Sequence, residues 1–187
     1  MSKYALIFPG IGYHSDKPLL YYGKKLAREF GYEIIEVSYS GFEQGIQGNR
    51  EKMMKAFEHA YRQSEQILKE YSFCKDDELL VISKSIGTAV AAFWQQKEQI
   101  SPKNIYFTPV EETFQFIRCN SGIVFHGTND PWARTENVKQ SCKNLELPLF
   151  LTEGANHSLE IGDMRIDLSH IVDIMKICFE YVSGELK

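Results

Sequence analysis

Three residue types that together can turn an alcohol into a nucleophile occur in separate short segments of this chain. Ser85 stands in "ISKSIG", Asp130 in "HGTNDP" and His157 in "EGANHS". A serine hydroxyl attacks a carbonyl carbon effectively when an imidazole accepts its proton, and that imidazole needs a carboxylate to fix its tautomer and stabilise its charge. The three residues therefore predict nucleophilic catalysis, provided that folding brings them together.

Ser85 lies where a buried strand is expected to turn directly into a helix. A nucleophile elbow needs small residues two positions before and two positions after the serine, because the tight turn brings those positions close together. Ser83 and Gly87 satisfy this requirement, whereas centring the turn on Ser83 would place Val81 at one of the two positions. The N-terminus of the following helix would aim N–H groups at the turn. The alternative is that Ser85 is an ordinary helix cap.

The acid and the base each have a simpler interpretation as well. Asn-Asp-Pro is common turn chemistry, so Asp130 alone could be a turn residue, and a loop histidine such as His157 is often a surface residue. Asp163 and Asp167 follow His157 and are weaker alternatives for the acid. Lys84 suggests a Ser–Lys dyad, but the spacing does not fit Ser-x-x-Lys, so we interpret it as a structural or rim residue.

Short, nearly unbroken apolar runs alternate with longer helical patterns along the chain, which predicts an α/β fold with a doubly wound parallel sheet and helices on both faces. The predicted strands are Tyr4–Phe8, Tyr32–Tyr39, Leu79–Ser83, Ile105–Val110, Gly122–His126 and Pro148–Thr152. The predicted helices are Asp16–Gly31, Arg50–Tyr71, Ile86–Lys97, Glu112–Arg118, Thr135–Asn144 and Arg165–Val182, and residues 40–49 read as a surface loop. In such sheets ligands bind at the carboxyl ends of the strands. Ser85, Asp130 and His157 each follow a predicted strand at that end.

Composition narrows the classes of partner. The chain has 187 residues, of which 43% are hydrophobic and 25% charged, with a net charge of −4. This balance argues against nucleic acid as the main partner, and no apolar run is long enough for a membrane span. We expect no signal peptide and no metal or other cofactor. The four cysteines are Cys74, Cys119, Cys142 and Cys178. They lack the spacing of a zinc site or a disulfide framework, which favours a cytoplasmic location.

The chain order serine, acid, histidine is the order of the α/β-hydrolase triad. Over nearly its whole length the chain resembles a small serine hydrolase of this fold, similar to the capless bacterial members grouped loosely with dienelactone-hydrolase-like proteins. Dienelactone hydrolases proper carry a cysteine at the elbow where this chain has Ser85, so their lactone substrate is not carried over. The resemblance implies one domain over residues 1–187 and six strands in the order 2-1-3-4-5-6.

The resemblance also implies further site residues. The backbone N–H groups of Ile11 and Ile86 would form the oxyanion hole, and the candidates for substrate contacts are His14, Tyr13 and Trp132. Only about ten residues follow the fourth strand before the fifth, which leaves no room for a cap and implies an open site for a small acyl substrate. We therefore expect an enzyme that cleaves a small carboxylic ester or thioester. The alternatives are an acyltransferase, an amidase or peptidase with the same triad, or a non-catalytic binding scaffold. The sequence does not indicate the oligomeric state.

Overall fold

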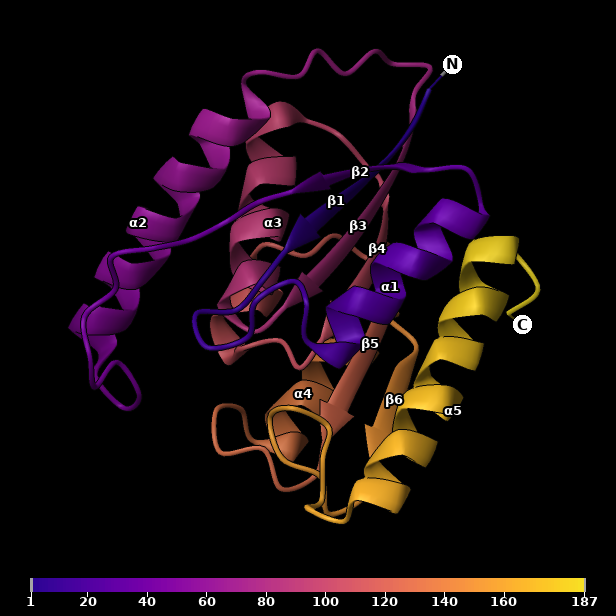
Figure 1. The fold of residues 1–187 in the computed structure, drawn as a ribbon. Helices are drawn as coiled ribbons and strands as arrows, with labels where there is room; N and C mark the ends of the chain where they lie inside the picture. The colour runs from indigo at the N-terminus through magenta and orange to yellow at the C-terminus, as the bar shows by residue number, and fades with distance from the viewer. Residues whose placement is uncertain (1, 187) are drawn as a thin grey trace.

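A six-stranded, entirely parallel sheet forms the centre of the protein in the computed structural model, which describes residues 2–186 (Figure 1). The strands are β1 (Lys3–Phe8), β2 (Glu33–Glu36), β3 (Glu78–Lys84), β4 (Lys103–Phe107), β5 (Gly122–Gly127) and β6 (Leu149–Thr152). Their order across the sheet is β2-β1-β3-β4-β5-β6, and every neighbouring pair is parallel. The predicted α/β fold and strand order are confirmed.

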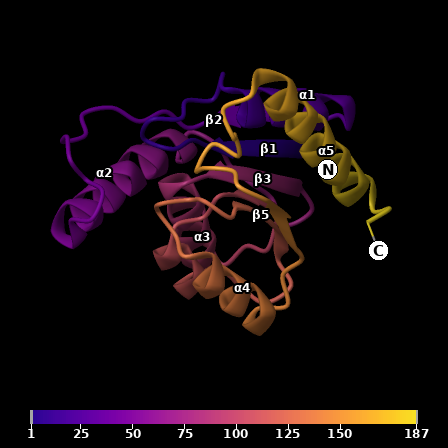
Figure 2. The same ribbon diagram turned by 90° about the horizontal axis from the view of Figure 1, so that it is seen from below.

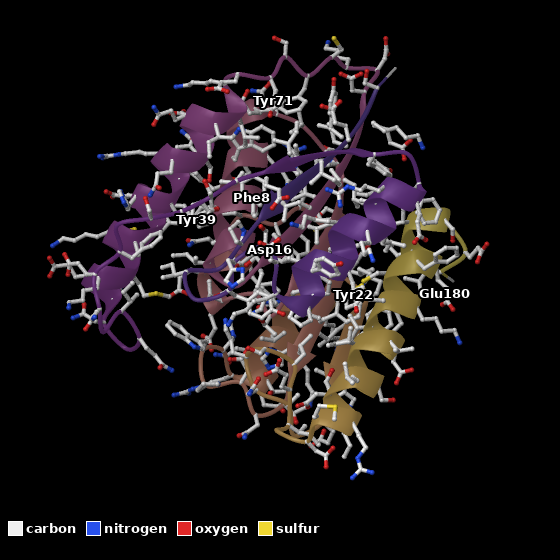
Figure 3. The ribbon with its side chains drawn as sticks, in the orientation of Figure 1. Phe8, Asp16, Tyr22, Tyr39, Tyr71 and Glu180 are labelled. Atoms are coloured by element: carbon white, nitrogen blue, oxygen red, sulfur yellow. The ribbon has the colours of Figure 1, made fainter. Side chains whose placement is uncertain are left out.

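Both faces of the sheet are covered, which explains why its strands are continuous apolar runs. In β1, Ala5 and Ile7 pack into one core cluster while Leu6 and Phe8 pack into another on the opposite face. Phe8 lies enclosed by other side chains in Figure 3, and its ring lies 6.2 Å from that of Trp94. Alternate side chains of one strand point to opposite faces, so a strand that is covered twice needs apolar residues at both.

Helices form a layer on each side of the sheet, as Figure 2 shows. The helices are α1 (Pro18–Glu29), α2 (Arg50–Leu68), α3 (Ile86–Glu98), the short 3₁₀ helix η1 (Glu111–Gln115), α4 (Thr135–Asn144) and α5 (Met164–Ser183). Helices α1 and α5 contact each other on one face, and α2, α3 and α4 cover the other. Within residues 2–186, no helix has both the length and the apolar character that crossing a membrane requires.

The first helix differs from its prediction at its start. It begins at Pro18, and Lys17 rather than Asp16 occupies the N-cap position without a side-chain cap bond. The Asp16 carboxylate instead pairs with the Lys24 ammonium group at 3.1 Å. The end agrees with the prediction, because Gly31 adopts a φ of +80° just beyond the last turn, a conformation that glycine accepts without strain.

Other elements also differ from their predicted bounds. β2 is limited to four residues at the sheet edge, although apolar character continues to Tyr39. β4 begins earlier than predicted, at Lys103, and ends at Phe107 because Thr108 takes a φ of +41° that breaks the strand. The helix predicted at residues 112–118 is the five-residue 3₁₀ helix η1.

Candidate active site

Ser85 occupies a single-residue turn between β3 and α3. Its backbone has φ +55° and ψ −131°, a conformation that costs a non-glycine residue free energy and is typical of functional turns. Its carbonyl oxygen accepts the N–H of Thr88 at 2.9 Å and the hydroxyl of Thr88 at 2.6 Å. Within residues 2–186 the Ser85 side chain makes no helix-cap bond, so the interpretation of Ser85 as an ordinary cap is wrong.

The end of β1 and its loop leave no room for a side chain at Gly87. A Cβ atom at this position would lie 2.3 Å from the carbonyl oxygen of Pro9 and 2.5 Å from that of Phe8. The elbow pattern predicts that residue 83 is the close neighbour that requires a small residue at position 87. The nearest atoms belong instead to β1 and its loop, while the Ser83 hydroxyl donates to the Ile105 carbonyl oxygen at 3.4 Å.

The three predicted polar side chains meet in a line. The Ser85 hydroxyl oxygen lies 2.8 Å from Nε2 of His157, and Nδ1 of His157 lies 2.7 Å from Oδ2 of Asp130. Because the Asp130 carboxylate only accepts, Nδ1 carries the ring hydrogen and Nε2 is free to accept from Ser85. The second carboxylate oxygen accepts the Trp132 backbone N–H at 2.8 Å, which fixes the orientation of the carboxylate.

The surroundings keep the imidazole of His157 neutral. Burial is the largest effect and lowers the pKa of His157. The hydrogen bond to Asp130 raises this pKa, and the nearby positive charge of Lys84 lowers it. A second imidazole, that of His126, lies behind the carboxylate with its Nδ1 3.8 Å from Oδ2 of Asp130. Burial also lowers the pKa of His126, and its Nδ1 has no hydrogen-bond partner among residues 2–186. The side chain of Asp130 is fully buried between the two rings.

Lys84, interpreted from the sequence as a structural or rim residue, lies inside the protein. Its side chain is completely buried, and its Nζ donates to the Thr108 hydroxyl and, at 2.8 Å, to the backbone carbonyl oxygen of His157. Thr108 donates to the same carbonyl oxygen at 3.0 Å. Nζ also lies 4.9 Å from the centre of the Tyr13 ring, and burial lowers the pKa of Lys84 to about 7. Lys84 is thus structural and not a rim residue.

The loop after β1 packs directly against the Ser85 turn. A Cβ at Gly10 would lie 3.0 Å from the Ser85 Cβ, and Gly10 and Tyr13 exchange two backbone hydrogen bonds of 3.1 and 3.3 Å. This turn places Ile11 at the edge of a hollow of about 540 Å³ that also contains Ser85, Ile86 and His157. Both residues expected to form the oxyanion hole therefore line the same hollow.

The predicted contact residues divide into two groups. Tyr13 and Trp132 line the hollow around Ser85, and the Trp132 ring lies 5.6 Å from the His157 ring. The Tyr13 hydroxyl accepts the Leu19 N–H at 3.1 Å, and burial raises its pKa to about 12. His14 instead lines a neighbouring hollow on the β2 side of the loop, where its Nδ1 accepts the Asp16 N–H at 3.3 Å. The structure does not bring His14 to Ser85.

The loop of residues 40–49 contributes wall residues that the sequence analysis missed. Glu43, Gly45, Ile46 and Gln47 line the hollow, and the Gln47 side-chain amide reaches the Pro131 carbonyl oxygen at 3.5 Å. These residues have no recognisable chemical pattern, so only the path of the chain reveals them. Among residues 2–186, no three His, Cys, Asp or Glu side chains gather as a metal site would require.

Comparison with known proteins supports the fold through structure alone. No protein-family model and no curated protein matches the chain. An α/β serine hydrolase homologue from Coxiella burnetii superposes with a TM-score of 0.64 at 14% identity, covering 96% of this chain and 84% of that protein. XC6422 from Xanthomonas campestris, an α/β serine hydrolase without a lid, gives 0.64 at 12% identity, covering 97% and 81%.

A third similar structure contains a ligand. Est1E from Butyrivibrio proteoclasticus with bound ferulic acid superposes with a TM-score of 0.59 at 12% identity, covering 94% of this chain and 89% of that protein. At such identities the likeness establishes the fold, and the chain has the fold of the α/β hydrolases. The resemblance noted from the sequence is confirmed at that level.

Proposed function

We propose that the protein is a serine hydrolase that cleaves a small carboxylic ester or thioester. The observation that carries this proposal is the continuous hydrogen-bonded line from Ser85 through His157 to Asp130, with contacts of 2.8 and 2.7 Å. These distances lie within the range that proton transfer in a triad requires. The strained turn at Ser85 and the buried carboxylate of Asp130 are consistent with the same role.

In the proposed first half-reaction, Ser85 Oγ bonds to the substrate carbonyl carbon while its proton passes to Nε2 of His157. Asp130 stabilises the imidazolium that forms. The N–H groups of Ile11 and Ile86 hold the developing oxyanion, and each such donor typically contributes about 3–4 kcal/mol to transition-state stabilisation. The intermediate then collapses, and the leaving alcohol or thiol takes the proton from His157.

In the second half-reaction, water attacks the acyl-enzyme and gives its proton to Nε2 of His157. Collapse of the second intermediate releases the carboxylic acid and returns the proton to Ser85. The lowered pKa of His157 supports this scheme, because the imidazole is then neutral and able to act as a base at neutral pH.

We also propose that the chain is a single domain without a cap, so that substrates reach Ser85 directly. The connection from β4 to β5 contains only η1, and loops that follow β1, β2, β5 and β6 line the hollow around Ser85. This arrangement supports a substrate of small or medium size, or an acyl group carried on a larger molecule.

The experiment is hydrolysis of p-nitrophenyl acetate and acetylthiocholine by the wild type and by two serine variants. We expect Ser85→Ala to lose at least about a thousandfold in kcat. The matched Ser83→Ala variant, which removes the other hydroxyl of the turn, should keep most of the activity. Equal activity of wild type and Ser85→Ala would contradict the proposal. Competing alcohols and amines in the same assay would reveal acyl transfer as the main reaction.

A further inference from the structure

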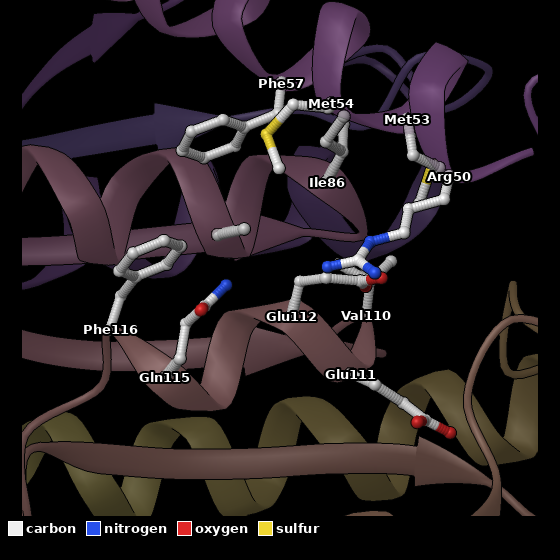
Figure 4. Close-up of a pocket in the computed structure, with 11 residues that line it drawn as sticks. Arg50, Met53, Met54, Phe57, Ile86, Val110, Glu111, Glu112, Gln115 and Phe116 are labelled. Carbon is white, nitrogen blue, oxygen red and sulfur yellow. The ribbon is translucent and has the colours of Figure 1, made fainter.

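A second hollow of about 450 Å³ adjoins the hollow that contains Ser85. It lies between α2, the first turns of α3 and η1, and Figure 4 shows its lining residues. Most of its lining is apolar: Met53, Met54, Phe57, Ile86, Ala89, Val110 and Phe116. Its size is within the range of small-molecule sites, which are mostly apolar with a few polar groups.

The two hollows share three wall residues: Met53, Ile86 and Val110. Ile86 directly follows Ser85 and lines both hollows. A group attached to a carbonyl carbon at Ser85 would therefore meet these apolar residues on its way to the second hollow. Methionine is flexible and packs well against alkyl groups of varied shape, which suits Met53 to this position.

The second hollow has an aromatic end and a polar wall, the latter formed by Glu111, Glu112 and Gln115 of η1. Phe57 and Phe116 stack with their ring centres 5.8 Å apart and their planes 9° apart. In Figure 4 both rings lie at the end of the hollow opposite Val110, and the Arg50 side chain reaches from α2 across the other end. The aromatic pair limits how far a chain can extend from Ser85.

We infer that this second hollow binds the alkyl chain of a medium-chain acyl group while its carbonyl carbon reacts at Ser85. The inference rests on the proposed hydrolase function. Three observations favour this occupant: the wall residues shared with the Ser85 hollow, the apolar side chains from α2 and α3, and the aromatic pair at the end opposite Val110. Met54 is 52% exposed on one wall, so the chain would enter from the open side.

The first test is a series of p-nitrophenyl esters from acetate to dodecanoate, in which the leaving group stays constant. We expect kcat/KM to rise with each added methylene, by up to about fourfold per fully buried group, and to level off or fall beyond octanoate. A series that is flat or falls from acetate onward would overturn the inference. A preference for benzoate over hexanoate would also overturn it, since it would indicate an aryl site.

The second test places a charge in the second hollow. Met54→Glu should lower the octanoate-to-acetate ratio of kcat/KM by about tenfold or more, because a carboxylate would then meet the chain. Gln66→Glu is the matched control: it adds the same charge to α2 at an exposed position outside the hollow. An unchanged ratio in Met54→Glu would overturn the inference. Should that variant fail to fold, Gln115→Glu adds a third carboxylate to the η1 wall, beyond those of Glu111 and Glu112, and is expected to lower the same ratio.

The two proposals fail in different ways. Absence of hydrolysis for every ester in the series, including acetate, would count against the proposed function. Hydrolysis of acetate that depends on Ser85 but shows no gain with chain length would leave the proposed function intact and overturn only the assignment of the second hollow.

Discussion

The backbone carbonyl oxygen of His157 accepts a hydrogen bond of 2.8 Å from the Nζ atom of Lys84, the residue that precedes Ser85. Ser85 thus presents its hydroxyl to the imidazole of His157, and the preceding residue, Lys84, holds the backbone of His157. Lys84 also contacts Thr108 and the ring of Tyr13. Its amine therefore links the carboxyl ends of three strands to the His157 loop.

Lys84→Met is expected to change the pH dependence of activity as well as its size. The positive charge of Lys84 lowers the pKa of His157, so its removal should raise that pKa and move the acid limb of the kcat/KM profile to higher pH. We also expect kcat to fall about tenfold, because the His157 carbonyl keeps only the bond from Thr108. The measurement is a pH–rate profile. Lys176→Met, which removes an exposed lysine of α5, is the control, and an acid limb that stays in place in Lys84→Met would contradict the expectation.

Stability should rise with pH because of Lys84. Burial lowers its pKa in the folded protein to about 7, whereas in the unfolded chain it lies near its ordinary value of about 10.4. Between these values the unfolded chain holds one more proton, so the free energy of unfolding rises with pH by at most about 1.4 kcal/mol per unit. Below pH 7 both states are protonated and the full cost of burying the charge is present. Urea unfolding of wild type and Lys84→Met at pH 7 and 9 checks this: the difference between the two proteins should shift in favour of wild type at pH 9.

Ser85→Gly should stabilise the fold while abolishing activity. At φ +55° the serine backbone is strained, and glycine adopts this conformation readily. We expect the free energy of unfolding of Ser85→Gly to be about 1–2 kcal/mol higher than that of Ser85→Ala. The alanine variant loses the same hydroxyl but keeps the backbone strain. Denaturant unfolding of the two variants gives the comparison. Equal stabilities would mean that the turn stores no strain.

Gly87→Ala is expected to damage the turn. Its Cβ would meet two backbone carbonyl groups that cannot rotate away, so β1 and α3 would have to move apart at a cost of about 2–3 kcal/mol. Gly12→Ala is the matched control, because a Cβ there has nothing within 4 Å and the backbone is not left-handed. Thermal unfolding should separate the two variants clearly, and similar Tm values would refute the close packing of α3 against β1.

The sheet was predictable because helices cover both of its faces, so strands such as β1 and β3 are continuous runs of apolar residues. Strand boundaries were less predictable where polar side chains form hydrogen bonds with residues outside the strand. Asn104 lies fully buried inside β4 because its side chain pairs with Gln95 and with two backbone carbonyl groups. No local sequence pattern indicates these hydrogen-bond partners of Asn104, so the predicted strand begins two residues too late.

At the candidate site, the residues at strand ends were accessible from the sequence because motif and strand order restrict their positions. Lys84 was not, since a buried ammonium group depends on acceptors that come from Thr108 and from the backbone of His157, far along the chain. The sequence also could not place His14, which lines the hollow next to the one that contains Ser85.

The most direct measurement is reaction of the folded protein with a fluorophosphonate, followed by mass spectrometry of its peptides. We expect one adduct on Ser85, formed at least about a hundredfold more slowly in His157→Ala and absent in Ser85→Ala. An unmodified Ser85 in the folded wild type, or an adduct on another serine at the same rate in all three proteins, would contradict the proposal that His157 and Asp130 activate this hydroxyl.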